Sequence, residues 1–123
     1  MAMYLVNAFS INMLDLSKDE LAVSIRKLTV NEARDLLAPD GHLAPDVAIA
    51  IGHIDTARIV GNLLGLPEED INRMVEAAQT RPTVKMTTGE KAVVAQYIGP
   101  RLPEGATRLP EGAKIEFFLV TLE

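Results

Sequence analysis

The sequence predicts a single α+β domain in which a mixed or antiparallel sheet is flanked by short helices. Helix signals gather in the middle of the chain, and segments with strand character lie toward both ends. The chain has 123 residues, a length typical of one domain, and a hydrophobic content of 48%, too high for a disordered chain. The predicted order of elements is β-β-α-α-α-β-β-β.

The N-terminal part predicts two strands separated by an irregular segment. Residues 4–8 (YLVNA) are mostly apolar and predict a buried strand, and polar residues interrupt the pattern over 9–16. Residues 20–28 alternate between two faces and predict a half-buried strand. Asn7 and Ser10 follow the first strand, where such residues usually form turns but can equally bind a phosphate or a base edge.

The middle of the chain predicts three helices. The sequence T-x-x-E at residues 29–32 forms a capping box, so a short helix should follow and end before Pro39. Residues 55–64 have helical spacing and are followed by a glycine. A proline and three acidic residues open a third helix at 67–70, which should run to about Gln79. Residues 45–51 are apolar without a clear helical or strand period, so the sequence does not decide their secondary structure.

The C-terminal part predicts three strands. Residues 83–86 and 92–98 flank the turn sequence T-T-G-E and predict a hairpin. Residues 114–122 (KIEFFLVTL) predict a final strand. Gln96 lies in an otherwise apolar strand, so its amide must either pair with backbone or face a ligand.

Composition limits the possible chemistry. The chain has no cysteine, which excludes disulfides, thiolate metal sites and a thiol nucleophile. His42 and His53 lack a metal-ligand spacing, so we expect neither a metal nor a cofactor. A net charge of −5 argues against long nucleic acids as partners. No apolar run approaches the ~20 residues of a membrane span, so we expect a soluble, cytoplasmic protein without a membrane partner.

One five-residue sequence, RLPEG, occurs twice, at residues 101–105 and 108–112. In each copy Leu-Pro-Glu-Gly fits a type I β-turn with proline at the second position and glycine at the fourth. Turn formation alone would explain both copies. Each copy also presents an arginine suited to phosphate and a glutamate able to orient a base. The pattern by itself does not choose between the copies.

His53 precedes a predicted helix that has Asp55 and Thr56 in its first turn. A histidine at a helix N-terminus, where backbone N–H groups attract phosphate, could perform general acid or base catalysis. A local capping or packing role is the alternative, and the sequence leaves both open. Arg81 precedes a proline and could be a solvated charge or a ligand-binding residue.

Three segments together resemble a known family. They are YLVNAFSINML (4–14), AIGHIDTARIVGNLLG (50–65) and QYIGPRLPEG (96–105). They are similar to the ring nucleases of archaeal viruses, phages and some bacteria, which antagonise type III CRISPR immunity by degrading cyclic tetraadenylate. The resemblance runs from the first predicted strand to the last, so it covers nearly the whole chain.

The resemblance implies a homodimer that closes over a ring-shaped, two-fold symmetric second messenger. It also implies a cytoplasmic location, which is the cytoplasm of the host cell if the protein is viral. It implies catalytic roles for His53, Glu104 and Arg101, and so assigns function to the first RLPEG copy. The implied ligand-binding residues are Asn7, Ser10, Arg81 and Gln96. Because this chain has extra residues before Arg81, interpreted as an added helix, Arg73 is a rival for that position.

The implied reaction is metal-independent cleavage of 3′–5′ phosphodiesters by the RNA's own 2′-hydroxyl, giving short linear adenylates. His53 would be the general acid for the 5′-oxygen, and Glu104 would orient His53 and keep it protonated. Arg101 would stabilise the charge developing on phosphate. Two other hypotheses are a sponge that binds the cyclic nucleotide without cutting it, and a structural or regulatory dimer without a nucleotide ligand.

Overall fold

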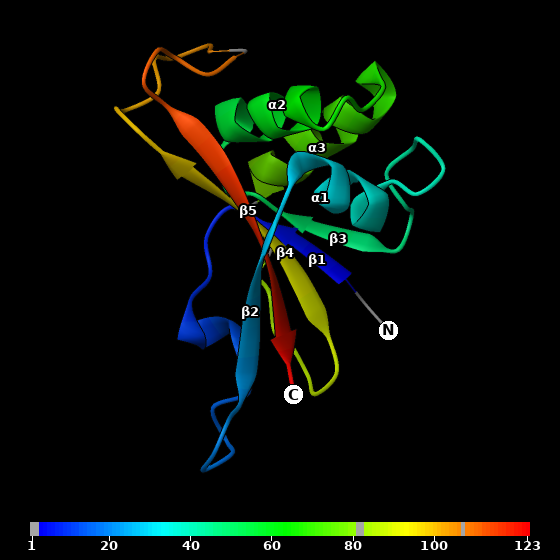
Figure 1. Ribbon diagram of the computed structural model, residues 1–123, viewed down its shortest axis with the longest axis vertical. Helices are drawn as coiled ribbons and strands as arrows, with labels where there is room; N and C mark the ends of the chain where they lie inside the picture. Colours follow the sequence, from blue (N-terminus) through cyan, green and yellow to red (C-terminus); the bar gives the residue numbers. More distant parts are fainter. Residues whose placement is uncertain (1–2, 81–82, 107) are drawn as a thin grey trace.

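The structure is a computed structural model that describes residues 3–80, 83–106 and 108–123. It contains a five-stranded sheet in the order β2-β5-β4-β1-β3, with the α-helices gathered on one side (Figure 1). The elements in chain order are β1 (Met3–Val6), the 3₁₀ helix η1 (Ile11–Met13), β2 (Val23–Leu28), α1 (Val30–Leu37), β3 (Val47–Ala50), α2 (Ile54–Leu63), α3 (Glu68–Thr80), β4 (Lys91–Ile98) and β5 (Lys114–Leu122).

The sheet is mixed, which confirms the predicted α+β fold. β1 lies between β3 and β4 and is parallel to both, whereas β5 is antiparallel to β4 and to β2. Parallel neighbours need long crossover connections. The chain from β1 to β3 supplies one through β2 and α1, and the chain from β3 to β4 supplies the other through α2 and α3.

The three predicted helices are confirmed. At the start of α1, the Glu32 N–H donates to Thr29 Oγ1 at 3.1 Å, and the Thr29 N–H donates to Glu32 Oε1 at 2.9 Å, as a capping box requires. α2 is followed by Gly65 with a φ of +68°, and α3 begins directly after Pro67. These boundaries were predictable because caps and stop signals act within a few residues.

The predicted hairpin over residues 83–98 is wrong, although its turn is present. The Glu90 N–H donates to the Thr87 carbonyl at 3.0 Å, but residues 83–86 form no strand; Met86 makes only an isolated bridge with Leu14. Both edges of β4 are already paired, one with β1 and the other with β5, so no edge remains for residues 83–86. The missing strand is β3, in the apolar segment that the sequence left open.

β2 is a strand as predicted, but it is not half-buried. Five of its six residues are exposed, and Leu28 alone is buried. The reason is its position at the edge of the sheet, where its other side meets no neighbouring strand. Its alternation is real but directs Ile25 toward a sheet face that the helices do not cover.

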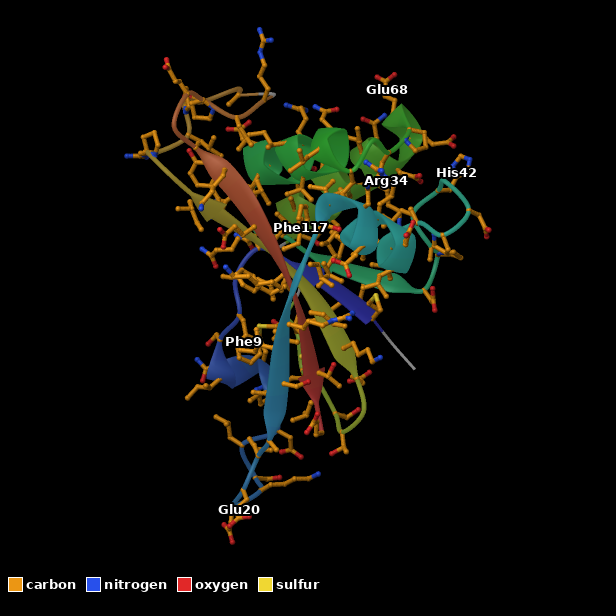
Figure 2. The ribbon with its side chains drawn as sticks, viewed as in Figure 1. Phe9, Glu20, Arg34, His42, Glu68 and Phe117 are labelled. Carbon is orange, nitrogen blue, oxygen red and sulfur yellow. The ribbon has the colours of Figure 1, made fainter. Side chains whose placement is uncertain are left out.

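The core has two layers, one on each face of the sheet. Residues of β4 and β5 alternate between these layers: Val93 and Phe117 pack with the helices, whereas Val94 and Val120 pack on the opposite face with Met13. Figure 2 shows Phe117 between sheet and helices, and Phe9 beside η1, away from the helices. Among the described residues, the second face is covered by η1, by its flanking segments with Phe9 and Leu21, and by the segment before β4.

Arg73 of α3 holds the segment that leads into β3. Its guanidinium donates to the carbonyl oxygens of Ala44 at 3.2 Å, Pro45 at 3.3 Å and Val47 at 2.8 Å. The buried carboxylate of Asp70 accepts from the Leu43 N–H at 3.0 Å in the same region. α3 therefore fixes the start of β3, and through β3 it fixes the position of the segment between β3 and α2.

We expect Arg73→Met to lower the free energy of unfolding by about 2–3 kcal/mol, because several carbonyl groups lose a charged donor. Urea denaturation of the wild type and the variant measures this difference. Arg26→Met is the control, since Arg26 is exposed on the edge strand and its loss should cost less than about 0.5 kcal/mol. Equal stability of the two variants would contradict this role of Arg73.

Candidate functional site

The three predicted catalytic residues line one cavity. His53, Arg101 and Glu104 surround an open pocket of about 740 Å³, within the ~300–1,000 Å³ typical of small-molecule sites. The remaining lining residues are Asp55, Thr56, Tyr97, Gly99 and Leu102. His53 thus lines the same cavity as Arg101 and Glu104, about 50 positions further along the chain, as their predicted shared role requires.

The strand directions explain this meeting. β1, β3 and β4 run parallel, so their carboxyl ends lie at the same edge of the sheet. Asn7 follows β1, His53 follows β3 and Arg101 follows β4. In open α/β sheets ligands bind at this edge. The sheet therefore places three polar side chains of distant sequence segments at one edge.

His53 occupies the N-cap position of α2 but makes no capping hydrogen bond with its side chain. The capping alternative is therefore wrong. The imidazole is exposed on the cavity wall, next to the first backbone N–H groups of α2, which attract anionic groups. A ligand phosphate in the cavity could approach both the imidazole and the helix end.

Both RLPEG copies form turns, but one residue later than predicted. The Ala106 N–H donates to the Pro103 carbonyl at 3.2 Å, so Gly105 is the third residue of its turn, not the fourth. Its φ of +79° is the value that a type II turn requires at this position. The second copy repeats the arrangement, with Gly112 at +81°. The predicted type I turn was wrong because it placed glycine at the fourth position, where no positive φ is needed. In the observed turns glycine is third, where the positive φ is required.

Only the first copy lies at the cavity. The N–H of Gly105 donates to Asp55 Oδ2 at 3.3 Å, which ties the turn that carries Glu104 to the first turn of α2. At the base of the loop the Tyr97 hydroxyl donates to the Pro100 carbonyl. A Cβ on Gly99 would lie 2.7 Å from that of Ala113, so the two arms of the loop need glycine there. Figure 1 shows the connection between β4 and β5, yellow to orange, beside α2.

Asp55 is the functional residue that the sequence interpretation missed. The sequence indicates only that it belongs to the first turn of a helix. A carboxylate in that position was the available signal, but its partner is a backbone N–H from a loop 50 residues away, which no local pattern reveals. Asp55 positions the loop without needing to touch a ligand.

The predicted ligand-binding residues do not all gather in this cavity. Asn7 Oδ1 accepts from the Gly52 N–H at 3.2 Å, so Asn7 supports the segment that carries His53. Ser10 caps η1 by accepting from the Asn12 N–H at 3.3 Å. Gln96 lines a separate, mainly apolar groove on the sheet face away from the helices. Arg81 lies outside the described residues.

Arg73, the rival to Arg81, does not line the cavity. Its guanidinium is bound to backbone carbonyl groups at the start of β3 and just before it. The structure therefore gives Arg73 a structural role. Over the described parts of the chain, no three His, Cys, Asp or Glu side chains are arranged to hold a metal ion. None of the helices described is both long and apolar enough to span a membrane.

The fold and this cavity define a small α+β protein with a candidate ligand site at the carboxyl ends of its parallel strands. The chain belongs to the STIV B116-like family, whose model matches residues 3–118. The chain is similar to a solved structure, B116 of Sulfolobus turreted icosahedral virus, with 30% sequence identity and a TM-score of 0.70. The match covers 98% of this chain and 99% of the B116 chain. A comparison with curated proteins finds no match.

We expect Asp55→Ala to loosen the turn that carries Glu104. The lost hydrogen bond is worth about 1 kcal/mol, so hydrogen exchange at the Gly105 amide should become roughly fivefold faster. Asp55→Asn is the matched control, because it removes the charge and keeps an acceptor oxygen. Nuclear magnetic resonance measures the exchange rates. Equal acceleration in both variants would show that the charge of Asp55 at the helix end matters and that its hydrogen bond with the Gly105 N–H does not.

Proposed function

We propose that this protein is a metal-independent ring nuclease that cleaves cyclic tetraadenylate to short linear adenylates and so shuts off type III CRISPR signalling. The observation that supports the proposal is the grouping of His53, Arg101 and Glu104 around one cavity. The sequence resemblance identified these three side chains as catalytic. Their convergence from α2 and the β4–β5 connection gives that assignment a spatial basis.

The reaction needs little from the protein beyond alignment, charge stabilisation and proton transfer. The 2′-hydroxyl of one adenylate loses its proton to water and attacks the adjacent phosphorus, and the bond from phosphorus to the 5′-oxygen breaks. The products carry a 2′,3′-cyclic phosphate at one end and a 5′-hydroxyl at the other. Holding the attacking oxygen in line contributes several kcal/mol to such a reaction.

The three catalytic candidates in the cavity each have a role in this scheme. His53 donates a proton to the departing 5′-oxygen, and the carboxylate of Glu104, on the same cavity, orients the imidazole. The Arg101 guanidinium neutralises charge on the phosphate oxygens as they become more negative. The N–H groups at the start of α2 add to this positive potential. Asn7, Ser10, Arg81 and Gln96 remain proposed contacts to the ring.

The proposed active form is a homodimer. The sheet face away from the helices carries a groove lined by Phe9, Ile25, Val94, Gln96, Phe118 and Val120. Ile25 is 60% exposed and Val23 is 37% exposed beside it. Apolar patches of this kind mark interaction surfaces, and a second copy would cover this one. A two-fold axis suits a ring of repeated adenylates, and Gln96 would lie in this interface.

We expect the wild type to cleave cyclic tetraadenylate in the presence of EDTA. His53→Ala should lose about 10²–10⁴-fold in rate while it still binds the ring, because a general acid contributes that much. Chromatography of the products measures cleavage, and calorimetry measures binding. His42→Ala is the matched control, since His42 is exposed near the start of α3 and away from the cavity.

Binding by the wild type without cleavage would favour the sponge. Binding of no cyclic nucleotide would favour the structural or regulatory dimer. Cleavage by His53→Ala at the rate of the wild type would remove His53 from the reaction.

We expect Ile25→Asp to convert the dimer into a monomer of 13.4 kDa. An unpaired carboxylate buried in an interface costs about 3 kcal/mol, roughly 100-fold in the dissociation constant. Ser24→Asp is the matched control, because Ser24 is exposed on the same strand but points to the opposite face. Sedimentation velocity distinguishes the two forms. A dimer unaffected by Ile25→Asp would place the interface elsewhere.

A further inference from the structure

A second cleft lies on the other side of His53. It has a volume of about 380 Å³ and is lined by Gly52, His53, Ile54, Asp55, Ala78 and Gln79. His53 and Asp55 line both this cleft and the larger cavity, so these two side chains form the shared wall. A ligand that is cleaved at His53 therefore has room on both sides of the imidazole.

The two spaces differ in charge. The larger cavity contains the Arg101 guanidinium, whereas the described residues that line the second cleft include no lysine or arginine. Both spaces contain the Asp55 carboxylate, and the second cleft also contains the last turn of α3, whose terminal carbonyl groups carry partial negative charge. The Arg101 guanidinium therefore favours a phosphate in the first space.

The polar groups of the second cleft suit a neutral, planar group with both donors and acceptors. The start of α2 presents N–H donors on one wall, and the end of α3 presents carbonyl acceptors and the Gln79 side chain on the other. Gln79 is exposed, so its amide can meet a ligand. A glutamine amide pairs with adenine through two hydrogen bonds, accepting from N6 and donating to N7.

We infer that this second cleft is a base subsite, in which Gln79 reads the adenine of a nucleotide next to the scissile phosphate. The inference rests on the proposed ring nuclease function and adds to it the residue that distinguishes adenine. The phosphate binds on the Arg101 side of His53 and the base binds on the α3 side. Gln79 contacts the substrate but takes no part in proton transfer, so it determines specificity rather than chemistry.

The test compares two rings that the enzyme cannot cut, because fluorine replaces every 2′-hydroxyl. One ring carries four adenines and the other four unsubstituted purines, which lack the N6 amine. The wild type should bind the adenine ring about tenfold more tightly, since the purine leaves the Gln79 oxygen without a donor. In Gln79→Ala this preference should fall to about one, through weaker binding of the adenine ring.

Asn72→Ala is the matched control. Asn72 is an exposed amide on the same helix and does not line the cleft, so its loss should leave the tenfold preference intact. Calorimetry of both rings against the three proteins gives the affinities.

Tight binding of both rings by the wild type with equal affinity would overturn the adenine subsite and leave the ring nuclease proposal standing. A tenfold preference that persists in Gln79→Ala would also overturn the adenine subsite and leave the ring nuclease proposal standing. Equal weakening of both rings by Gln79→Ala would place Gln79 against the sugar–phosphate backbone and would also overturn the subsite. Failure of the wild type to bind either ring would overturn both proposals.

Discussion

The parallel pairing of β1 with both β3 and β4 determines where the candidate site lies. It brings three carboxyl ends to one edge of the sheet, and each end leads into a segment that carries a polar side chain of the site. The hydrogen bond from the Gly52 N–H to Asn7 Oδ1 joins two of these segments directly. The pairing also requires the crossovers that contain α2 and α3, so the same constraint that aligns the strands places two helices next to His53.

Local signals in the sequence predicted the helices well, because capping and termination depend on residues a few positions apart. The capping box at Thr29 and the glycine after α2 are examples. Strand pairing was not predictable in the same way. Residues 83–86 have strand character and a good turn beside them, yet β4 has no edge left for them. Likewise β2 alternates as a half-buried strand does, but its position at the sheet edge leaves it exposed.

The site shows the same division between local and long-range information. The catalytic candidates His53, Arg101 and Glu104 were identified by resemblance, and the structure brings them to one cavity. The separate position of Gln96 could not be read from the sequence, because the face of a strand residue depends on which layer packs against each side. The contribution of Asp55 was hidden for a related reason. Its partner is the backbone of a turn, and a backbone N–H has no signature in the sequence.

A chain with a net charge of −5 can still attract an anionic ring, because charge acts locally in salt solution. The acidic cluster that opens α3 includes Glu68, which Figure 2 labels, and the 11 residue steps to Gln79 correspond to about 16 Å along the helix. Screening at physiological salt acts over about 8 Å. Among the described residues that line the cavity, the charged groups are Arg101, Asp55 and Glu104, and the start of α2 adds its N–H groups. The Gly105 N–H donates to Asp55, so the carboxylate nearest the start of α2 is held by the loop that carries Glu104.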